Sequence, residues 1–469
     1  MKKIKGIGIF IIFGLSWLVL FWLTGSRTPW QVFSPNHPEG GIVVSLGDME
    51  GRSYDRMGFE GGVVLYSKKL DGWIAGTTNG EIYALHLDGS EDWEHSIGSG
   101  GIRALALSKD GSILYVGEQS PEGVLYALDV SNGNVLWSFS GRSVIGAESA
   151  IKADPSPISI STDEKGNVYA VFYRFTLRKD RKRGYISRII SFTQDGRERW
   201  RYPKNENLDC WANGGDVSGY SGRFAFATAN YEEGQNKHLT YDSTLYVIDT
   251  ETGQLIHNET IPAAPLFGNT TIRSGPTYAR DGRYLAAIAS DGRGFLFDPD
   301  GHVLWERWVS KAQQVQNSWI NAAGRRADVL PEGVAFTTIN TFNRENWQMP
   351  SPVIHPSSNS LFLFTLDGTF KFRYTAPAEI EDTVYQAGTA AIAIGRNVRN
   401  HDYKAHGMVV VSLQDGSVLA RYHTAGPVQA AAMSEDGRYV AGIEVPAVTP
   451  EGNLIGAYRL HIWDRERDR

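Results

Sequence analysis

A recurring hairpin pattern limits the fold of this chain more than any other feature of its sequence. The clearest copy spans residues 124–137 (VLYALDVSNGNVLW), where alternating apolar and polar residues lead into a turn and then an apolar stretch that ends in Trp. Alternation with a period of two is typical of a half-buried strand, and Ser-Asn-Gly is typical of a turn. Related hairpins occupy residues 82–93, 189–200, 245–256, 295–305, 361–372 and 409–420.

A second hairpin precedes several of these copies, at residues 106–117, 159–171, 278–288 and 432–443. Two hairpins per unit make a four-stranded antiparallel blade, and such units repeated with unequal loops are typical of a β-propeller. We therefore predict an all-β propeller with eight blades. Seven is the alternative, because the inner hairpin of the sixth unit can lie within residues 327–340 or within residues 351–364. The likeness of residues 211–230 to residues 319–340 favours the first reading.

The eighth copy predicts how the ring closes. It begins at residues 460–464 (LHIWD) and meets the C-terminus before a partner strand follows. A propeller must hide the edge strands of its first and last blades, and a strand from one terminus commonly completes the blade built by the other. Residues 41–46 (GIVVSL) have the pattern of a strand and precede the first complete unit. We expect them to supply the missing outer strand.

The N-terminal 40 residues have a different pattern. A basic tip at residues 1–5 precedes an uncharged apolar run within residues 6–24, which as a helix just crosses a bilayer core of about 30 Å. The lysines of the tip predict a cytoplasmic N-terminus. We expect a single-pass signal anchor in the cytoplasmic membrane at residues 6–24, a linker at residues 25–40 and a periplasmic or extracellular propeller at residues 41–469. Cleavage near residues 24–26 is the alternative.

Composition excludes some classes of function. The net charge of -6 at neutral pH leaves no generally basic surface for a nucleic acid. The single cysteine, Cys210, excludes an internal disulfide. His401, Asp402 and His406 are close in sequence, but their spacing suits neither a strand face nor a helix, so we interpret them as part of a polar loop and expect no metal site.

The hairpin at residues 124–137 contains a spaced motif, A-x-D-x-x-x-G-x-x-x-W, at Ala127, Asp129, Gly133 and Trp137. The motif resembles the tryptophan-docking repeat of the PQQ-like (quinoprotein dehydrogenase-type) β-propellers. The resemblance implies that the Trp stacks on the neighbouring blade and that the Asp holds the turn. The tryptophan recurs in other copies at Trp93, Trp200 and Trp305.

The enzymes of this family hold PQQ and a Ca²⁺ or similar ion over the propeller axis, and many have a disulfide between adjacent cysteines. This chain has one cysteine and incomplete motifs, so it is more similar to the non-catalytic, BamB-like propeller subunit of the outer-membrane β-barrel assembly machinery. The resemblance implies a protein-binding scaffold or assembly subunit of an envelope complex, without cofactor or small-molecule ligand. The alternatives are a PQQ- or metal-dependent oxidoreductase and a carbohydrate- or polymer-binding propeller.

Two groups of residues are candidates for binding. Tight turns are expected at one end of every blade and long loops at the other, among them residues 174–185, 230–243 and 306–326. The first of these loops has a concentrated positive charge that fits an acidic partner or anionic envelope polymer, at Arg178, Lys179, Arg181, Lys182 and Arg183. The second group precedes two inner strands and is expected either to face the axis or to pack between blades, at Trp211, Asn213, Trp319 and Asn321.

Overall fold

The structure is a computed structural model, and it describes residues 41–467 apart from residues 48, 50–61, 99, 149–152, 178–182, 232–239, 268–269, 344–352, 396–404 and 450. The chain divides into two units, Met1–Gly40 and Gly41–Arg469. The predicted basic tip, anchor and linker make up the first unit, which lies outside the described residues. Within the part that is described, no helix is long and apolar enough to cross a membrane. The anchor stays a prediction.

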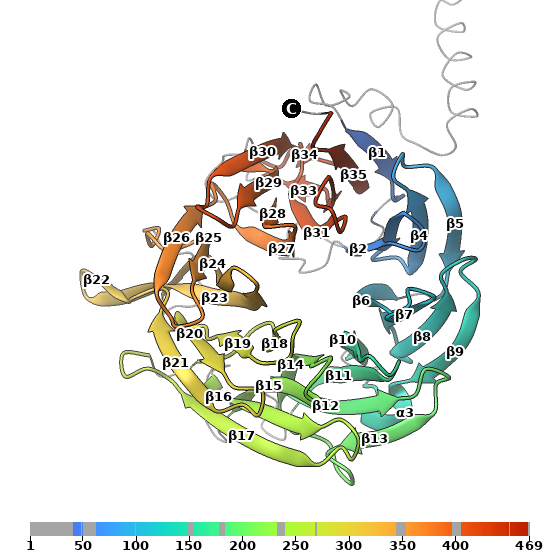
Figure 1. The fold of residues 1–469 in the computed structure, drawn as a ribbon, viewed down its shortest axis with the longest axis horizontal. Helices are drawn as coiled ribbons and strands as arrows, with labels where there is room; N and C mark the ends of the chain where they lie inside the picture. Colours follow the sequence, from blue (N-terminus) through green and yellow to red (C-terminus); the bar gives the residue numbers. More distant parts are fainter. Residues whose placement is uncertain are drawn as a thin grey trace, which may run out of the picture. The chain divides into compact units, whose positions relative to one another are not determined.

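The second unit is a ring of eight antiparallel sheets, called blades 1–8 here in the order of their inner strands (Figure 1). From the axis outward, blade 1 contains β2 (Val63–Ser67), β3 (Gly72–Gly76), β4 (Glu81–His86) and β5 (Glu91–Ser96). Blade 2 contains β6 (Gly101–Leu107), β7 (Ile113–Gln119), β8 (Val124–Asp129) and β9 (Val135–Ser140). After the short helix α3 (Arg142–Ile145), blade 3 contains β10 (Ser156–Thr162), β11 (Val168–Leu177), β12 (Arg183–Phe192) and β13 (Glu198–Tyr202).

The next three blades keep this order. Blade 4 contains β14 (Trp211–Val217), β15 (Arg223–Tyr231), β16 (Thr240–Asp249) and β17 (Leu255–Pro262). Blade 5 contains β18 (Thr277–Tyr278), β19 (Leu285–Ile288), β20 (Arg293–Phe297) and β21 (Val303–Trp308). Blade 6 contains β23 (Ser318–Leu330), β24 (Gly333–Asn343), β25 (Ser360–Phe364) and β26 (Phe370–Thr375), with an extra strand β22 (Gln313–Val315) on the free edge of β23. Its inner hairpin therefore contains residues 327–340, as predicted.

The last two blades bring the chain back to its first strand. Blade 7 contains β27 (Ile380–Gln386), β28 (Thr389–Ile394), β29 (Gly407–Ser412) and β30 (Val418–His423). Blade 8 contains β31 (Val428–Met433), β32 (Tyr439–Glu444), β35 (Arg459–Asp464) and β1 (Ile42–Ser45). A small hairpin of β33 (Ala447–Val448) and β34 (Leu454–Ile455) lies in the connection before β35. Eight blades, and not seven, are confirmed.

The ring closes as the sequence predicts. Strand β1 pairs antiparallel with β35, with Ile42 opposite Ile462 and Ser45 opposite Arg459. Leu46, directly after β1, is fully buried in the apolar cluster that joins blade 8 to blade 1. A strand from the start of the chain thus covers the edge that β35 would otherwise expose.

The core is divided among the contacts between blades. Eight clusters of buried apolar side chains each join two neighbouring blades, and together they run around the whole ring. Between blades 1 and 2, for example, Ile74 and Ala84 pack with Leu114 and Val116. Both faces of a blade are therefore buried. This explains why strands near the axis have continuous apolar runs, such as the last five residues of β28 (TAAIAI).

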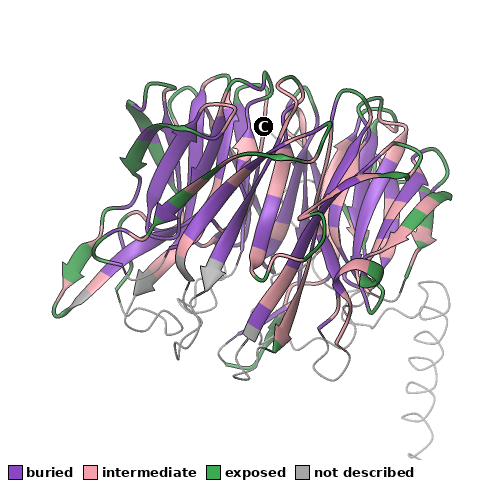
Figure 2. Cartoon of the chain, turned by 90° about the horizontal axis from the view of Figure 1, so that it is seen from below, coloured by how far each residue is buried: buried purple, intermediate pink, exposed green. Residues whose placement is uncertain are grey.

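The two ends of the ring differ in their connections (Figure 2). At the end that we call the tight-turn end, short turns join the first strand of each blade to the second and, in blades 1–7, the third strand to the fourth; they range from residues 331–332 to residues 279–284. At the opposite, long-connection end, several connections are longer, such as residues 263–276 and 445–458, although others, such as residues 120–123, are short. The expectation of uniformly tight turns at one end is confirmed, and the long loops expected at the other end occur there beside some short connections.

Much of what looked like loop at the long-connection end is strand. Within residues 174–185, strands β11 and β12 continue to Leu177 and from Arg183, and Phe175 lies opposite Tyr185. Within residues 306–326, β22 pairs with the start of β23 and forms a hairpin that projects from the ring (Figure 1). Cross-strand aromatic pairs stabilise such extensions, whereas the charges within these segments made the sequence resemble loops.

Candidate functional site

The docking tryptophans join neighbouring blades. The indole N–H of Trp93 in blade 1 donates to the carbonyl of Val130 in blade 2, at 2.8 Å. Three further indoles repeat this bond to the next blade's outer turn: Trp137 to Gln194 at 2.9 Å, Trp200 to Thr250 at 2.8 Å, and Trp305 to Leu366 at 2.8 Å. Each of these bonds fixes one blade against the following one at the tight-turn end.

Glycine in the turn makes room for each indole. Gly133 has φ +71°, and a Cβ added to it would lie 2.7 Å from the ring of Trp93. At Gly196 a Cβ would lie 2.6 Å from Trp137. The turn itself is held by Asp129, whose carboxylate accepts the N–H of Ser131 at 2.8 Å and its hydroxyl at 2.6 Å. These hydroxyl and amide donors lower the pKa of Asp129. Ala127 is fully buried and lies opposite Trp137 in the same hairpin.

Other side chains take the place of the indole in three of the four remaining joints. In blade 4 it is replaced by His257, whose ring lies 4.3 Å from that of His302 in the outer turn of blade 5. In blade 6, Phe372 covers Gly416 of blade 7. At the closure, Ile42 of β1 covers Gly89 of blade 1. The sequence motif does not reveal these contacts, because a tryptophan at that position is part of its definition.

The predicted axial residues lie mainly between blades. The ring of Trp211 stacks on Tyr185 of blade 3, with ring centroids 5.3 Å apart. The side-chain amide of Asn213 donates to the carbonyl of Ile272 ahead of blade 5. The buried amide of Asn321 donates to the carbonyl of Ser290 at 3.2 Å. Trp319 pairs with Gln314 in the projecting hairpin of β22 and β23, and its place at the axis or between blades stays a prediction.

The inner strands carry charged side chains that the sequence analysis did not single out. Arg326 of β23 forms an ion pair with Asp328, at 2.9 Å, and lies 3.7 Å from Asp382 of blade 7. On β14, burial raises the pKa of Asp216 to about 6, although the N–H groups of Tyr278 and Val217 donate to this carboxylate. Alternation along a strand could not reveal this group, because it says nothing about which neighbouring blade a polar side chain meets.

The predicted basic cluster lies at the tip of the β11–β12 hairpin. Arg178, Lys179, Arg181 and Lys182 lie outside the described residues, and of Arg183 the structure describes only the backbone, at the start of β12. The stem below them is well held, because Thr176 donates to Glu148 at 3.0 Å and Arg174 to the carbonyl of Ile145. The role of the tip in binding stays a prediction.

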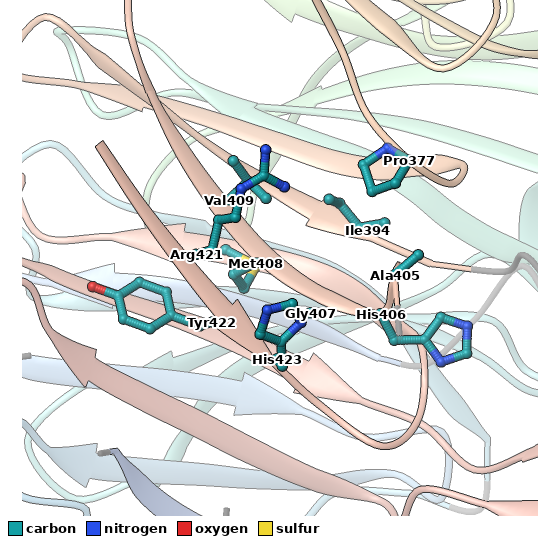
Figure 3. Close-up of a pocket in the computed structure, with 10 residues that line it drawn as sticks. All are labelled: Pro377, Ile394, Ala405, His406, Gly407, Met408, Val409, Arg421, Tyr422 and His423. Carbon is teal, nitrogen blue, oxygen red and sulfur yellow. The ribbon is translucent and has the colours of Figure 1, made fainter. Parts of the chain in front are cut away.

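A pocket of about 200 Å³ lies at the long-connection end of blade 7 (Figure 3). Its wall is mainly apolar, with Ile394, Met408 and Val409, and its polar groups include Arg421 and His423. Tyr422 points away from the others in Figure 3 and stacks on Trp463 of blade 8, at 4.9 Å. Pockets for drug-sized ligands and cofactors measure about 300–1,000 Å³, so this one suits at most a side chain of a partner.

Over the residues described, no three His, Cys, Asp or Glu side chains gather in a way that could hold a metal ion. Of the histidine pair considered in the sequence, His401 lies outside these residues, and His406 is buried with Nδ1 3.2 Å from the carbonyl of Ala425.

Comparisons with known proteins identify a family with the same architecture. The family model described as outer membrane protein assembly factor BamB matches residues 30–221 and 78–265. Among solved structures, the crystal structure of BamB from Moraxella catarrhalis is similar, with a TM-score of 0.47 and 15% sequence identity over 84% of this chain and 91% of that one. No curated protein matches the chain.

Proposed function

Because the chain belongs to the PQQ-like β-propeller family whose model describes the assembly factor BamB, we propose that it is a non-catalytic protein-binding scaffold, an assembly subunit of an envelope complex. The observation that carries this proposal is the contrast between the two ends of the ring. Long connections, strand extensions and an added hairpin gather at one end, while short turns fill the other (Figure 2). Binding residues tend to collect on loops that a rigid scaffold positions.

The scaffold beneath these connections is held on all sides. Apolar clusters join every pair of neighbouring blades, and the docking side chains fix the blades at the opposite end. A binding surface on such a ring needs little ordering when a partner arrives, which limits the entropic cost of association. In this proposal residues 6–24 anchor the protein in the cytoplasmic membrane, with the propeller on the outer side and other envelope proteins as its partners.

Capture of partners tests the proposal. Full-length protein, extracted from membranes in a mild detergent, should retain one or more envelope proteins. A variant with Ile354→Glu and Leu454→Glu, two exposed residues of the long-connection end (each 60% exposed), should retain less of them. Tyr220→Glu in a tight turn, 70% exposed, is the matched control and should retain as much as wild type. Equal loss in both variants contradicts the proposed surface.

The enzyme alternative within the family needs its own experiment. We expect purified protein supplied with PQQ and Ca²⁺ to show no dye-coupled dehydrogenase turnover with alcohols or sugars, since the sequence lacks the adjacent cysteines and most copies of the complete docking motif. PQQ-dependent turnover above background favours the oxidoreductase and overturns the scaffold proposal.

A further inference from the structure

Irregular residues interrupt the inner strands at one level of the ring. The pairing of inner strand with second strand shifts at Arg103 of blade 2, Arg325 of blade 6, Glu381 of blade 7 and Gln429 of blade 8. In blade 5 the corresponding segment is residues 273–276, between the bridge of Ile272 with Ala289 and strand β18. A β-bulge re-aims a side chain out of the alternating pattern. The strict alternation that assigns neighbouring side chains to the two blade faces therefore does not hold at these residues.

Contacts fix Arg273 between its neighbouring blades. Before it, the carbonyl of Ile272 accepts the side-chain amide of Asn213 from blade 4. After it, the hydroxyl of Ser274 donates to the carbonyl of Arg325 in blade 6, at 2.6 Å. Gly275 lies so near Gly214 that an added Cβ would be 2.7 Å from its backbone. The segment is thus held on both sides, and Arg273 lies beside the bulge that bears Arg325.

No residue of the part of the chain that the structure describes forms an ion pair with the Arg273 guanidinium, although the more distant Glu379 carboxylate favours its charged form. The guanidinium makes no hydrogen bond in that part of the chain and has no carboxylate within ion-pair distance. Its neighbour Arg325 is paired with Glu381 at 3.2 Å, but its side chain remains 26% exposed. Burial lowers the pKa of Arg273 most, and the positive charge of Arg325 lowers it further, while the negative charge of Glu379 raises it. A partly buried cation beside another cation is unfavourable unless an anion compensates it.

We propose that Arg273 and Arg325 form an anion site in the irregular inner segments of blades 5 and 6, toward the long-connection end, and that it takes a carboxylate of an acidic partner segment. Guanidinium groups bind carboxylates with two parallel hydrogen bonds, and Arg325 keeps donors beyond those that Glu381 uses. The choice of a partner segment as the source rests on the proposed scaffold function. A free dicarboxylate offers the same chemistry, so the experiment separates the two sources.

Calorimetric titration of the full-length protein in detergent tests the site with two probes. One is succinate and the other is a tetraglutamate peptide with blocked ends, both at low and high salt. Arg273→Gln should weaken binding of the probe about tenfold or more, the loss expected for a charge-assisted hydrogen bond. Arg283→Gln is the matched control, because this arginine lies in the same blade, is 74% exposed and pairs with Asp281 at the tight-turn end.

A second readout separates a binding arginine from a structural one. Without ligand, Arg273→Gln should melt at the same temperature as wild type or higher, because the substitution removes an uncompensated cation. Probe should raise the melting temperature of wild type and of Arg283→Gln, but hardly that of Arg273→Gln.

Each result decides the proposal. Stronger binding of the peptide assigns the site to a protein segment, and equal binding of succinate assigns it to a free dicarboxylate. No binding of either probe, equal binding by Arg273→Gln and wild type, or a lower melting temperature of Arg273→Gln with unchanged affinity overturns it. The titration uses no cellular partner, so its failure is distinct from a failure to capture envelope proteins.

Discussion

Replacing Trp137 with Ala should weaken the joint between blades 2 and 3. The indole donates to the Gln194 carbonyl at 2.9 Å, covers Gly196, and lies 5.8 Å from the ring of Phe192. Truncating a buried Trp or Phe costs about 3–5 kcal/mol of unfolding free energy. Trp137 is only partly buried, so we expect the lower end, about 3 kcal/mol, of which the hydrogen bond accounts for about 1 kcal/mol.

Equilibrium unfolding in urea, followed by far-UV circular dichroism, measures this loss. Trp137→Phe keeps a ring without the N–H and should lose about 1 kcal/mol plus a small packing term. Leu136→Ala is the matched control on the same strand, because Leu136 is 52% exposed and such surface changes stay within about 0.5 kcal/mol. Partner capture by the folded fraction should not change. If Trp137→Ala is no less stable than Leu136→Ala, the indole does not hold the joint.

Three further predictions concern the closure, a buried ion pair and the basic tip. Deleting residues 41–46 removes β1 and the fully buried Leu46. One buried Leu→Ala change costs about 2–5 kcal/mol of unfolding free energy, so the deletion should cost more than this and lower the melting temperature accordingly. An unchanged melting curve contradicts the closure. Glu444 is fully buried, and although burial would raise its pKa, hydrogen bonds from His461 and Arg459 hold the pKa at about 2 against an ordinary 4.5. Because this pKa is lower in the folded state, its contribution to stability, about 3 kcal/mol, is present above pH 4.5 and lost as the pH falls toward 2. Glu444→Gln should therefore be less stable at pH 7 and lose less stability on acidification, and parallel pH profiles for the two proteins refute this. Changing Arg178, Lys179, Arg181, Lys182 and Arg183 to Glu should reduce partner capture, most strongly at low salt, with an unchanged melting temperature; capture equal to wild type at low salt rules out an electrostatic role.

The hairpins and the closure could be predicted because they depend on local alternation and on counting. Each copy repeats an apolar strand, a Gly turn and a second strand, and the incomplete copy at residues 460–464 indicated a partner elsewhere in the chain. The number of blades depends on the inner hairpin of blade 6, which residues 327–340 form. The repeated hairpins and the closing strand both follow from the need to bury both faces of every blade.

Other features depend on contacts that a sequence does not show. The bulge at Arg325 shifts the alternation of β23, so a period-two reading cannot tell which way this side chain lies. His257 occupies the place of a docking tryptophan, and its contact with His302 of the next blade is visible only in the structure. Strands β11 and β12 extend through a charged segment because Phe175 and Tyr185 pair across them. Composition favoured a loop there, and tertiary pairing decided otherwise.

The claim that partners bind at the long-connection end is tested most directly by site-specific photo-crosslinking in cells. A photoreactive residue at Ile354 or Leu454 reports on that end, and one at Tyr220 reports on the tight turns; all three positions are at least 60% exposed. We predict that an envelope protein is crosslinked from positions 354 and 454 and not from position 220. Crosslinks that arise mainly from position 220 contradict the account.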